Sequence, residues 1–221
     1  MASNNPVTFA LSKGRILEET LPLLEQAGIA PSEDILRTRK LMVDGPENIR
    51  YLIIRAADVG TYVERGAADL GIMGRDLLLE HRPHVMEPLD LKIGCCRLCV
   101  AGPMSTLAHG RPSHGSRIRV ATKYDYLAEE HFLKHGVQTD IIHLYGSMEL
   151  APLVGMADRI VDLVSTGATL AANGLEIEET LFDISSRLIM NPASYATRRD
   201  ALSSIGDRLK EAVARQEDHH D

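Results

Sequence analysis

Aromatic and cysteine residues are scarce in this sequence. Its 221 residues include no tryptophan, and all aromatics together make up only 4%. Because 44% of the residues are nonetheless apolar, the composition predicts a globular protein with an aliphatic core and argues against intrinsic disorder. The three cysteines, Cys95, Cys96 and Cys99, share one apolar segment, and no second pair completes four zinc ligands. They are interpreted as reduced, mostly buried thiols.

The chain also lacks a basic excess and a long apolar run. Its 24 Lys and Arg residues face 31 Asp and Glu residues, a formal charge of −7. This balance argues against a sequence-independent nucleic-acid binder, although it permits a locally basic cleft. No apolar run approaches the roughly 18 residues that a membrane helix needs. The first residues, MASNNPVTFALSKGR, do not resemble a secretory signal, so the expected compartment is the cytoplasm.

Strand patterns alternate with helical patterns along most of the chain. This order predicts an α/β fold with mostly parallel sheet and helices on both faces. A loop rich in Gly, Pro and Ser, residues 102–115, interrupts the pattern and favours two lobes. The predicted strands are residues 7–11, 39–44, 49–55, 68–73, 92–101, 117–121, 139–144, 159–164 and 181–189. The predicted helices lie around residues 17–24, 57–65, 75–81, 124–135, 147–157 and 198–215, with a short one that ends at 173.

Residues 160–170, IVDLVSTGATL, carry the most informative pattern for ligand binding. An apolar strand ends there in small and hydroxyl residues, and a short helix then begins. Backbone amides at a helix start can hold an anion, and the Ser165, Thr166 and Thr169 hydroxyls can add donors. Asp162, just ahead of this loop, can accept hydrogen bonds from ribose hydroxyls. A simple turn and helix cap would use the same residue types, so the segment alone leaves both readings open.

Two further segments follow predicted strands. Lys13, Gly14 and Arg15 place two cations around a glycine at a helix start, which suits a polyphosphate but is also compatible with a solvated surface. In residues 68–76, ADLGIMGRD, two glycines bracket a short strand. They could admit a flat base or could serve only tight packing.

Together these segments resemble one family, the ATP phosphoribosyltransferases. An acid followed by Thr-Gly-x-Thr is the arrangement that phosphoribosyltransferases use for phosphoribosyl pyrophosphate, although type I enzymes have two adjacent acids where this chain has Asp162-Leu163. The resemblance covers essentially the whole chain. Its motifs are ALSKGR (10–15), TRKL (38–41), GAADLGIMGRD (66–76), KIGCCRLCVA (92–101), RVATKY (119–124), GSMELAPLVGMADRIVDLVSTGATLAANGL (146–175) and ISSRLIMNP (184–192).

The resemblance implies two α/β lobes, similar to type II periplasmic binding proteins, with the active site in the cleft. Residues 1–92 and 181–221 are expected to form the lobe on the ATP side, and residues 93–180 the lobe that binds phosphoribosyl pyrophosphate. The implied reaction joins N1 of the adenine of ATP to the anomeric carbon of phosphoribosyl pyrophosphate with inversion. It releases pyrophosphate and opens histidine biosynthesis. Catalysis is expected to rest on positioning and electrostatics without a covalent enzyme intermediate.

The resemblance also implies roles for individual residues. Arg15 and Arg39 are the expected catalytic cations that stabilise phosphate and pyrophosphate charge. Supporting contacts are expected from Lys13, Gly14 and Lys40. Catalytic Asp162, with Glu149, is expected to hold the ribose hydroxyls.

The remaining expected contacts come from two short stretches. The 5′-phosphate is expected on the loop formed by Ser165, Thr166, Gly167, Ala168 and Thr169. The ATP site is expected beside Asp69, Leu70 and Gly71. The histidines show no ligand spacing, so no protein metal site is predicted.

The family resemblance further implies Mg²⁺, held mainly through substrate oxygens. The length resembles the short form of the family, which lacks an ACT-like regulatory domain and works with a separate regulatory subunit related to histidyl-tRNA synthetase. Such members form homodimers alone and hetero-oligomers with the partner. A non-catalytic two-lobe solute-binding or sensory module remains the main alternative. A kinase is disfavoured because no Gly-rich loop ending in Gly-Lys-Ser/Thr is present.

Overall fold

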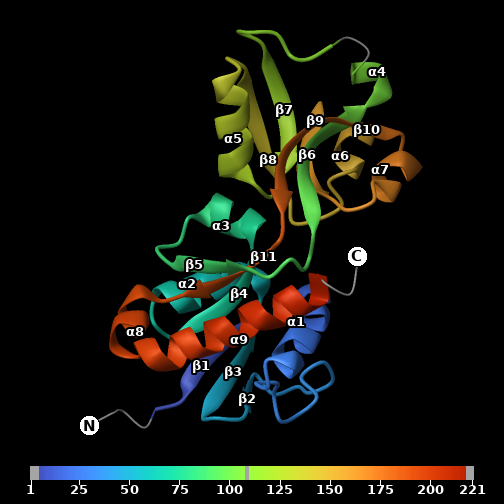
Figure 1. Ribbon diagram of the computed structural model, residues 1–221. Coiled ribbons are helices and arrows are strands. Elements are labelled where there is room, and N and C mark those ends of the chain that lie inside the picture. The colour runs from blue at the N-terminus through green and yellow to red at the C-terminus, as the bar shows by residue number, and fades with distance from the viewer. Residues whose placement is uncertain (1–4, 108–109, 218–221) are drawn as a thin grey trace. The chain divides into compact units, whose positions relative to one another are not determined.

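The computed structural model describes residues 5–107 and 110–217, and contacts within the chain divide it into two units (Figure 1). Unit 1 contains the described residues up to Leu78, the segment Arg82–Gly94 and the residues from Ser185 on. Unit 2 contains Leu79–His81 and Cys95–Ile184. Each unit has a sheet of its own.

Unit 1 has a six-stranded sheet. Its strands are β1 (Val7–Ser12), β2 (Met42–Asp44), β3 (Ile49–Ile54), β4 (Leu70–Gly74), β5 (Met86–Asp90) and β11 (Ser186–Met190). Its helices are α1 (Arg15–Gln26), α2 (Ala56–Glu64), α8 (Pro192–Thr197) and α9 (Arg199–Glu217), and α3 (Arg75–His81) begins in this unit. The strand order is β2-β3-β1-β4-β11-β5, in which β1 runs parallel to both β3 and β4.

Alternating residues of β1 show how the two faces of this sheet are covered. Phe9 and Leu11 belong to the large apolar core that also contains buried residues of α1 and α9. Ala10, between them, belongs to a second core with Val59 and Val63 of α2. Because successive side chains of a strand point to opposite faces, α1 and α9 cover one face and α2 covers the other. The helices that follow β1 and β3 thus lie on opposite sides of the sheet.

Unit 2 has a five-stranded sheet. Its strands are β6 (Cys96–Pro103), β7 (Arg117–Thr122), β8 (Gln138–His143), β9 (Arg159–Val164) and β10 (Leu175–Ile184). Its helices are α4 (Met104–Leu107), α5 (Asp125–Lys134), α6 (Leu150–Leu153) and α7 (Ala168–Ala172). The order is β10-β6-β9-β7-β8. Strands β9, β7 and β8 are parallel, whereas β6 is antiparallel to both of its neighbours.

The predicted α/β class with two sheets is confirmed. Parallel pairing, however, is confined to β3-β1-β4 and to β9-β7-β8. The other strand pairs are antiparallel, so both sheets are mixed rather than mostly parallel. No helix in the described part of the chain is long and apolar enough to cross a bilayer.

Several element boundaries differ from the prediction. The helix expected over residues 147–157 is reduced to α6. Ser147, with φ 54°, is not helical and lies ahead of it, and Gly155, with φ 72°, follows its end. The strand expected over residues 181–189 is two strands, β10 and β11, separated at Ser185, where the chain passes from one unit to the other. Neither β5 nor α8 was predicted. The sequence does contain a signal for α8. The Asn191 Oδ1 accepts a hydrogen bond from the Ser194 amide at 2.8 Å and caps the helix, and Pro192 takes the first helical position.

Candidate functional site

A cavity of about 190 Å³ lies in unit 2 where β9 ends and α7 begins. It brings together all the residues predicted to hold the ribose and its 5′-phosphate. In the sequence these residues are close neighbours, except for Glu149. The lining residues are Cys99, Ala101, Glu149, Ile160, Asp162, Leu163, Val164, Ser165, Thr166, Gly167, Ala168, Thr169 and Leu170.

The position of Asp162 follows from its place on β9. The antiparallel strand β6 puts Cys99 directly opposite Asp162, so both side chains lie on one face of the sheet. Leu170 of α7 belongs to the same apolar cluster as Cys99, which shows that α7 covers this face. Asp162 is half-buried, and its Oδ1 accepts a hydrogen bond from the Leu163 amide at 2.8 Å. A strand thus fixes a carboxylate in the cavity wall.

The loop after β9 offers hydrogen-bond donors. It turns through Gly167, whose φ of 82° lies in the left-handed region that favours glycine. The Ala168 amide donates to the Thr166 hydroxyl at 3.3 Å. Among the described residues, no carbonyl accepts a hydrogen bond from the amides of residues 165–167 or of Thr169. These amides and the exposed hydroxyls of the loop suit an anion such as a phosphate group.

Glu149 supplies the second carboxylate of the cavity. It is half-buried at the N-terminus of α6, next to Met148, which is 1% exposed and anchors the segment in the core. Together with Asp162 it accounts for the charged residues that the structure shows in the cavity lining. Two carboxylates without a cation disfavour a bare polyanion, but they are good acceptors for sugar hydroxyls.

In unit 1, Lys13, Gly14 and Arg15 lie where β1 ends and α1 begins. Gly14 has φ 102°, and a Cβ there would meet open space, so backbone conformation rather than crowding explains the glycine. The Arg15 Nε lies 3.5 Å from Glu19 Oε1, and both side chains are exposed. Such a pair is weak, and it leaves the guanidinium accessible to a ligand.

Arg39 and Lys40 precede β2 and reach the same edge of the sheet. The Ile53 amide donates to the Leu41 carbonyl at 2.9 Å, which places this segment beside the carboxyl end of β3. The carboxyl end of β1 lies next to it in the sheet. The Lys40 Nζ contacts Glu33 at 2.5 Å on the surface. The structure thus brings the two predicted pairs of cations to one edge.

Asp69 lies at the opposite edge. It precedes β4, which is parallel to β1, and therefore sits at the amino ends of these strands. Its Oδ2 accepts a hydrogen bond from the Thr8 amide at 2.8 Å and pairs with Arg198 at 2.8 Å. These contacts tie the start of the sheet to the chain just ahead of α9, and they occupy the carboxylate.

Leu70 and Gly71 are buried within the sheet. Leu70 is fully buried in the large core of unit 1. A Cβ at Gly71 would lie 2.8 Å from methyl groups of both Val59 and Val63, so the glycine permits the close approach of α2 to β4. The expected place of Asp69, Leu70 and Gly71 beside ATP stays a prediction, and this geometry favours a structural role instead.

The sequence reasoning missed the part of the cavity wall that β6 contributes. Cys99 and Ala101 come from this strand, and both are buried against the site. No local signal marks them, because only the antiparallel pairing of β6 with β9 brings them there. The expectation of mostly buried cysteines holds for Cys99, whereas Cys96 is half-buried and Cys95 is exposed.

No group of three or more His, Cys, Asp or Glu side chains in the described ranges could hold a metal ion. A divalent cation in the cavity would therefore find at most the Asp162 and Glu149 carboxylates and would need ligand oxygens from a bound substrate.

The known proteins that this chain is similar to include ATP phosphoribosyltransferases. A model of the family described as "ATP phosphoribosyltransferase" matches residues 55–211. An ATP phosphoribosyltransferase of Halorhodospira halophila is 56% identical over 214 residues, which cover 96% of this chain and 97% of the relative.

Solved structures with a similar fold support the fold class. A chain of the ATP phosphoribosyl transferase (HisG:HisZ) complex from Thermotoga maritima is 33% identical, with a TM-score of 0.81 and coverage of 97% of this chain and 100% of that one. The GluR0 ligand-binding core from Nostoc punctiforme, bound to glutamate, is 14% identical, with a TM-score of 0.57 and coverage of 97% and 94%. At that identity the second likeness concerns the fold alone.

Proposed function

The chain belongs to the ATP phosphoribosyltransferase family, and on this premise we propose how its described residues perform the reaction. The protein transfers the phosphoribosyl group of phosphoribosyl pyrophosphate to N1 of the adenine of ATP, the first step of histidine biosynthesis. The alternative of a non-catalytic binding module has only the likeness of fold in its favour.

The observation that carries the proposed mechanism is the convergence of two carboxylates and a donor loop in the cavity of unit 2. Asp162 and Glu149 accept hydrogen bonds from the ribose hydroxyls. The amides and hydroxyls of residues 165–169 hold the 5′-phosphate. Both ends of the phosphoribosyl group are then fixed, which positions its anomeric carbon for attack.

The cations at the edge of unit 1 supply the electrostatic part. As the bond to pyrophosphate breaks, negative charge gathers on the leaving group and the ribosyl carbon becomes cationic. Arg15 and Arg39 stabilise the phosphate charge, and Lys13 and Lys40 support them. Preorganised charges of this kind act without a covalent intermediate. In this assignment unit 1 binds ATP and unit 2 binds phosphoribosyl pyrophosphate.

Magnesium fits the cavity as a substrate-bound ion. Mg²⁺ keeps several waters and is commonly bound by one or two carboxylates plus substrate phosphates, which is what Asp162 and Glu149 can provide. Such an ion would neutralise the charge of the pyrophosphate that the two carboxylates otherwise repel. It is therefore assigned mainly to substrate oxygens, and Asp162 and Glu149 would be the protein carboxylates available to it.

We further propose that the chain works with a regulatory subunit related to histidyl-tRNA synthetase. The Thermotoga maritima relative is described as a HisG:HisZ complex, and it matches 97% of this chain. A homodimer alone and a hetero-oligomer with the partner are the proposed assemblies. The proposed compartment is the cytoplasm, because both substrates are polyanions that do not cross a bilayer.

The test is to incubate the chain with ATP, phosphoribosyl pyrophosphate and Mg²⁺, with and without the partner subunit, and to follow phosphoribosyl-ATP and pyrophosphate. We expect both products in equal amounts. Binding of the substrates without either product, in folded protein with the partner present, would instead support a binding module.

A further inference from the structure

Thr122 is the last residue of β7, and it lies where the sheet of unit 2 opens beside the cavity. Strand β7 runs between β9 and β8, and Thr122 is in register with Val161 on one side and with His143 on the other. The pairing of β9 with β7 ends at Val161, whereas its pairing with β6 continues through Val164. Asp162 is therefore the first residue of β9 that pairs with β6 alone.

The side chain of Thr122 bridges this opening. Thr122 is 0% exposed, and its hydroxyl donates a hydrogen bond to the Val161 carbonyl at 2.7 Å. The same hydroxyl accepts a hydrogen bond from the Tyr124 amide at 2.9 Å, in the turn that leads into α5. The Val161 carbonyl belongs to the planar peptide group that joins Val161 to Asp162. One buried hydroxyl thus fixes the peptide group from which Asp162 projects.

The main chain of Thr122 holds the segment that leads to the second carboxylate of the cavity. The Leu144 amide donates a hydrogen bond to the Thr122 carbonyl at 2.9 Å. Leu144 follows β8 and packs against the apolar cluster that contains Met148, the residue ahead of Glu149. Thr122 therefore contacts both segments that bring an acidic side chain to the cavity.

We propose that Thr122 is a positioning residue for ribose binding, which acts by fixing Asp162 through the Val161 carbonyl. This assignment rests on the proposed function and deepens it. Thr122 belongs to the RVATKY motif, residues 119–124, to which the site gave no role. The described lining of the cavity does not include Thr122, so its effect on a substrate passes through other groups. Binding groups must be held within about 0.5 Å of their productive positions, and a misplacement of about 1 Å can cost about 100-fold in rate.

The experiment compares Thr122→Val, which has nearly the same shape without the hydroxyl, with Thr122→Ser, which keeps the hydroxyl. Steady-state kinetics with the partner subunit present give the Michaelis constants for phosphoribosyl pyrophosphate and ATP. We expect Thr122→Val to raise the constant for phosphoribosyl pyrophosphate about tenfold or more and to leave that for ATP unchanged. Thr122→Ser should stay close to the unaltered chain. Thr139→Val is the matched control, because Thr139 is a half-buried threonine of the neighbouring strand β8.

A double-mutant cycle with Asp162→Ala separates positioning from a general loss of structure. If Thr122 acts through Asp162, Thr122→Val should add little to the Michaelis constant for phosphoribosyl pyrophosphate once Asp162 is alanine. The assignment is overturned if the two effects multiply in the double variant, if both substrates are affected equally, or if Thr122→Ser is impaired as much as Thr122→Val.

Thermal unfolding is measured for every variant, and Thr122→Cys replaces Thr122→Val if the latter does not fold. A lower melting temperature with an unchanged Michaelis constant for phosphoribosyl pyrophosphate also contradicts the positioning role. Failure of the proposed function gives a different result, because the unaltered chain would then form no phosphoribosyl-ATP. An active chain with an unchanged Thr122→Val variant contradicts only the role of Thr122.

Discussion

At the residue scale, the cavity of unit 2 combines hydrogen-bond acceptors with hydrogen-bond donors. Asp162 and Glu149 provide the acceptors, and residues 165–169 provide amides and hydroxyls. Because the described lining contains no lysine or arginine, charge attraction from these side chains does not explain the proposed binding of a phosphorylated sugar there. On the proposed assignment, the protein's own contribution to affinity comes from directed hydrogen bonds, which makes each of these groups individually important.

The substitution Asp162→Ala should raise the Michaelis constant for phosphoribosyl pyrophosphate about tenfold or more, because a hydrogen bond to a charged group typically contributes about 1.5–3 kcal/mol. The melting temperature should change little, since Asp162 is half-buried in the cavity wall. Steady-state kinetics and calorimetry measure the two effects.

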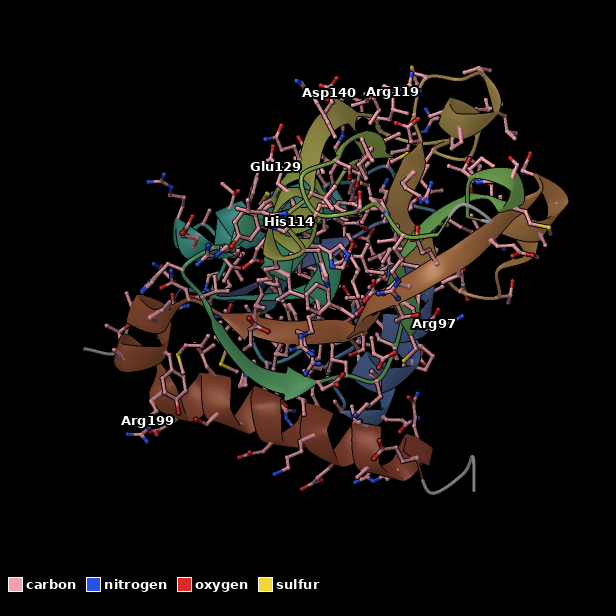
Figure 2. The ribbon with its side chains drawn as sticks, turned by 90° about the horizontal axis from the view of Figure 1, so that it is seen from above. Arg97, His114, Arg119, Glu129, Asp140 and Arg199 are labelled. Atoms are coloured by element: carbon pink, nitrogen blue, oxygen red, sulfur yellow. The ribbon has the colours of Figure 1, made fainter. Side chains whose placement is uncertain are left out.

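Asp140→Ala provides the control for this substitution. Asp140 is an exposed aspartate of the same sheet, the register partner of Arg119 on the neighbouring strand (Figure 2). The Asp140→Ala substitution should leave the Michaelis constant for phosphoribosyl pyrophosphate and the melting temperature nearly unchanged. Equal effects of the two substitutions would remove Asp162 from the ribose site.

At the element scale, the sequence predicted best what depends on neighbouring residues. Strand β9 and its loop were predicted with correct bounds, because the change from apolar to small polar residues at Ser165 is continuous in the chain. The edge strand β5 was missed, since its sequence MEPLD contains a proline and two acids and lacks an apolar pattern. Helix α1 was predicted in spite of Pro22, and it forms with this proline inside.

The prediction of the site was limited by contacts between strands that are far apart in the sequence. Cys99 reaches the cavity only through antiparallel pairing, which an apolar pattern does not encode. The glycines of residues 68–76 left two readings open, and the structure supports close packing at Gly71. Asp69 has an acidic side chain in a recognisable motif, yet its partners Thr8 and Arg198 are too far away in sequence to be inferred.

Gly71→Ala tests the packing of α2 on β4. The added Cβ would lie 2.8 Å from methyl groups of Val59 and Val63, so the free energy of unfolding should fall by about 1–3 kcal/mol. The Michaelis constant for ATP of the folded fraction should stay the same. Gly146→Ala is the control, because a Cβ there meets no atom within 4 Å. Stability is measured by urea unfolding. If Gly71→Ala raised the Michaelis constant for ATP without a loss of stability, a direct contact between Gly71 and ATP would be favoured instead.

At the scale of the whole molecule, the two units carry opposite kinds of site. The cavity of unit 2 is lined by two carboxylates, whereas the carboxyl edge of the unit 1 sheet carries exposed cations. On the proposed assignment, two polyanionic substrates are distinguished by chemistry. The cations of unit 1 bind the phosphates of ATP, and the acceptors and amides of unit 2 bind the ribose with its 5′-phosphate.

The central claim is that the loop after β9 holds the 5′-phosphate, and hydrogen exchange read by mass spectrometry tests it most directly. Exchange is measured with and without phosphoribosyl pyrophosphate and Mg²⁺. Because the amides of residues 165–167 have no carbonyl partner within the described chain, the substrate should slow their exchange strongly, while strand β8 serves as an internal reference that does not respond. Saturating substrate that leaves exchange in residues 162–171 unchanged, with protection at another place, would contradict the account.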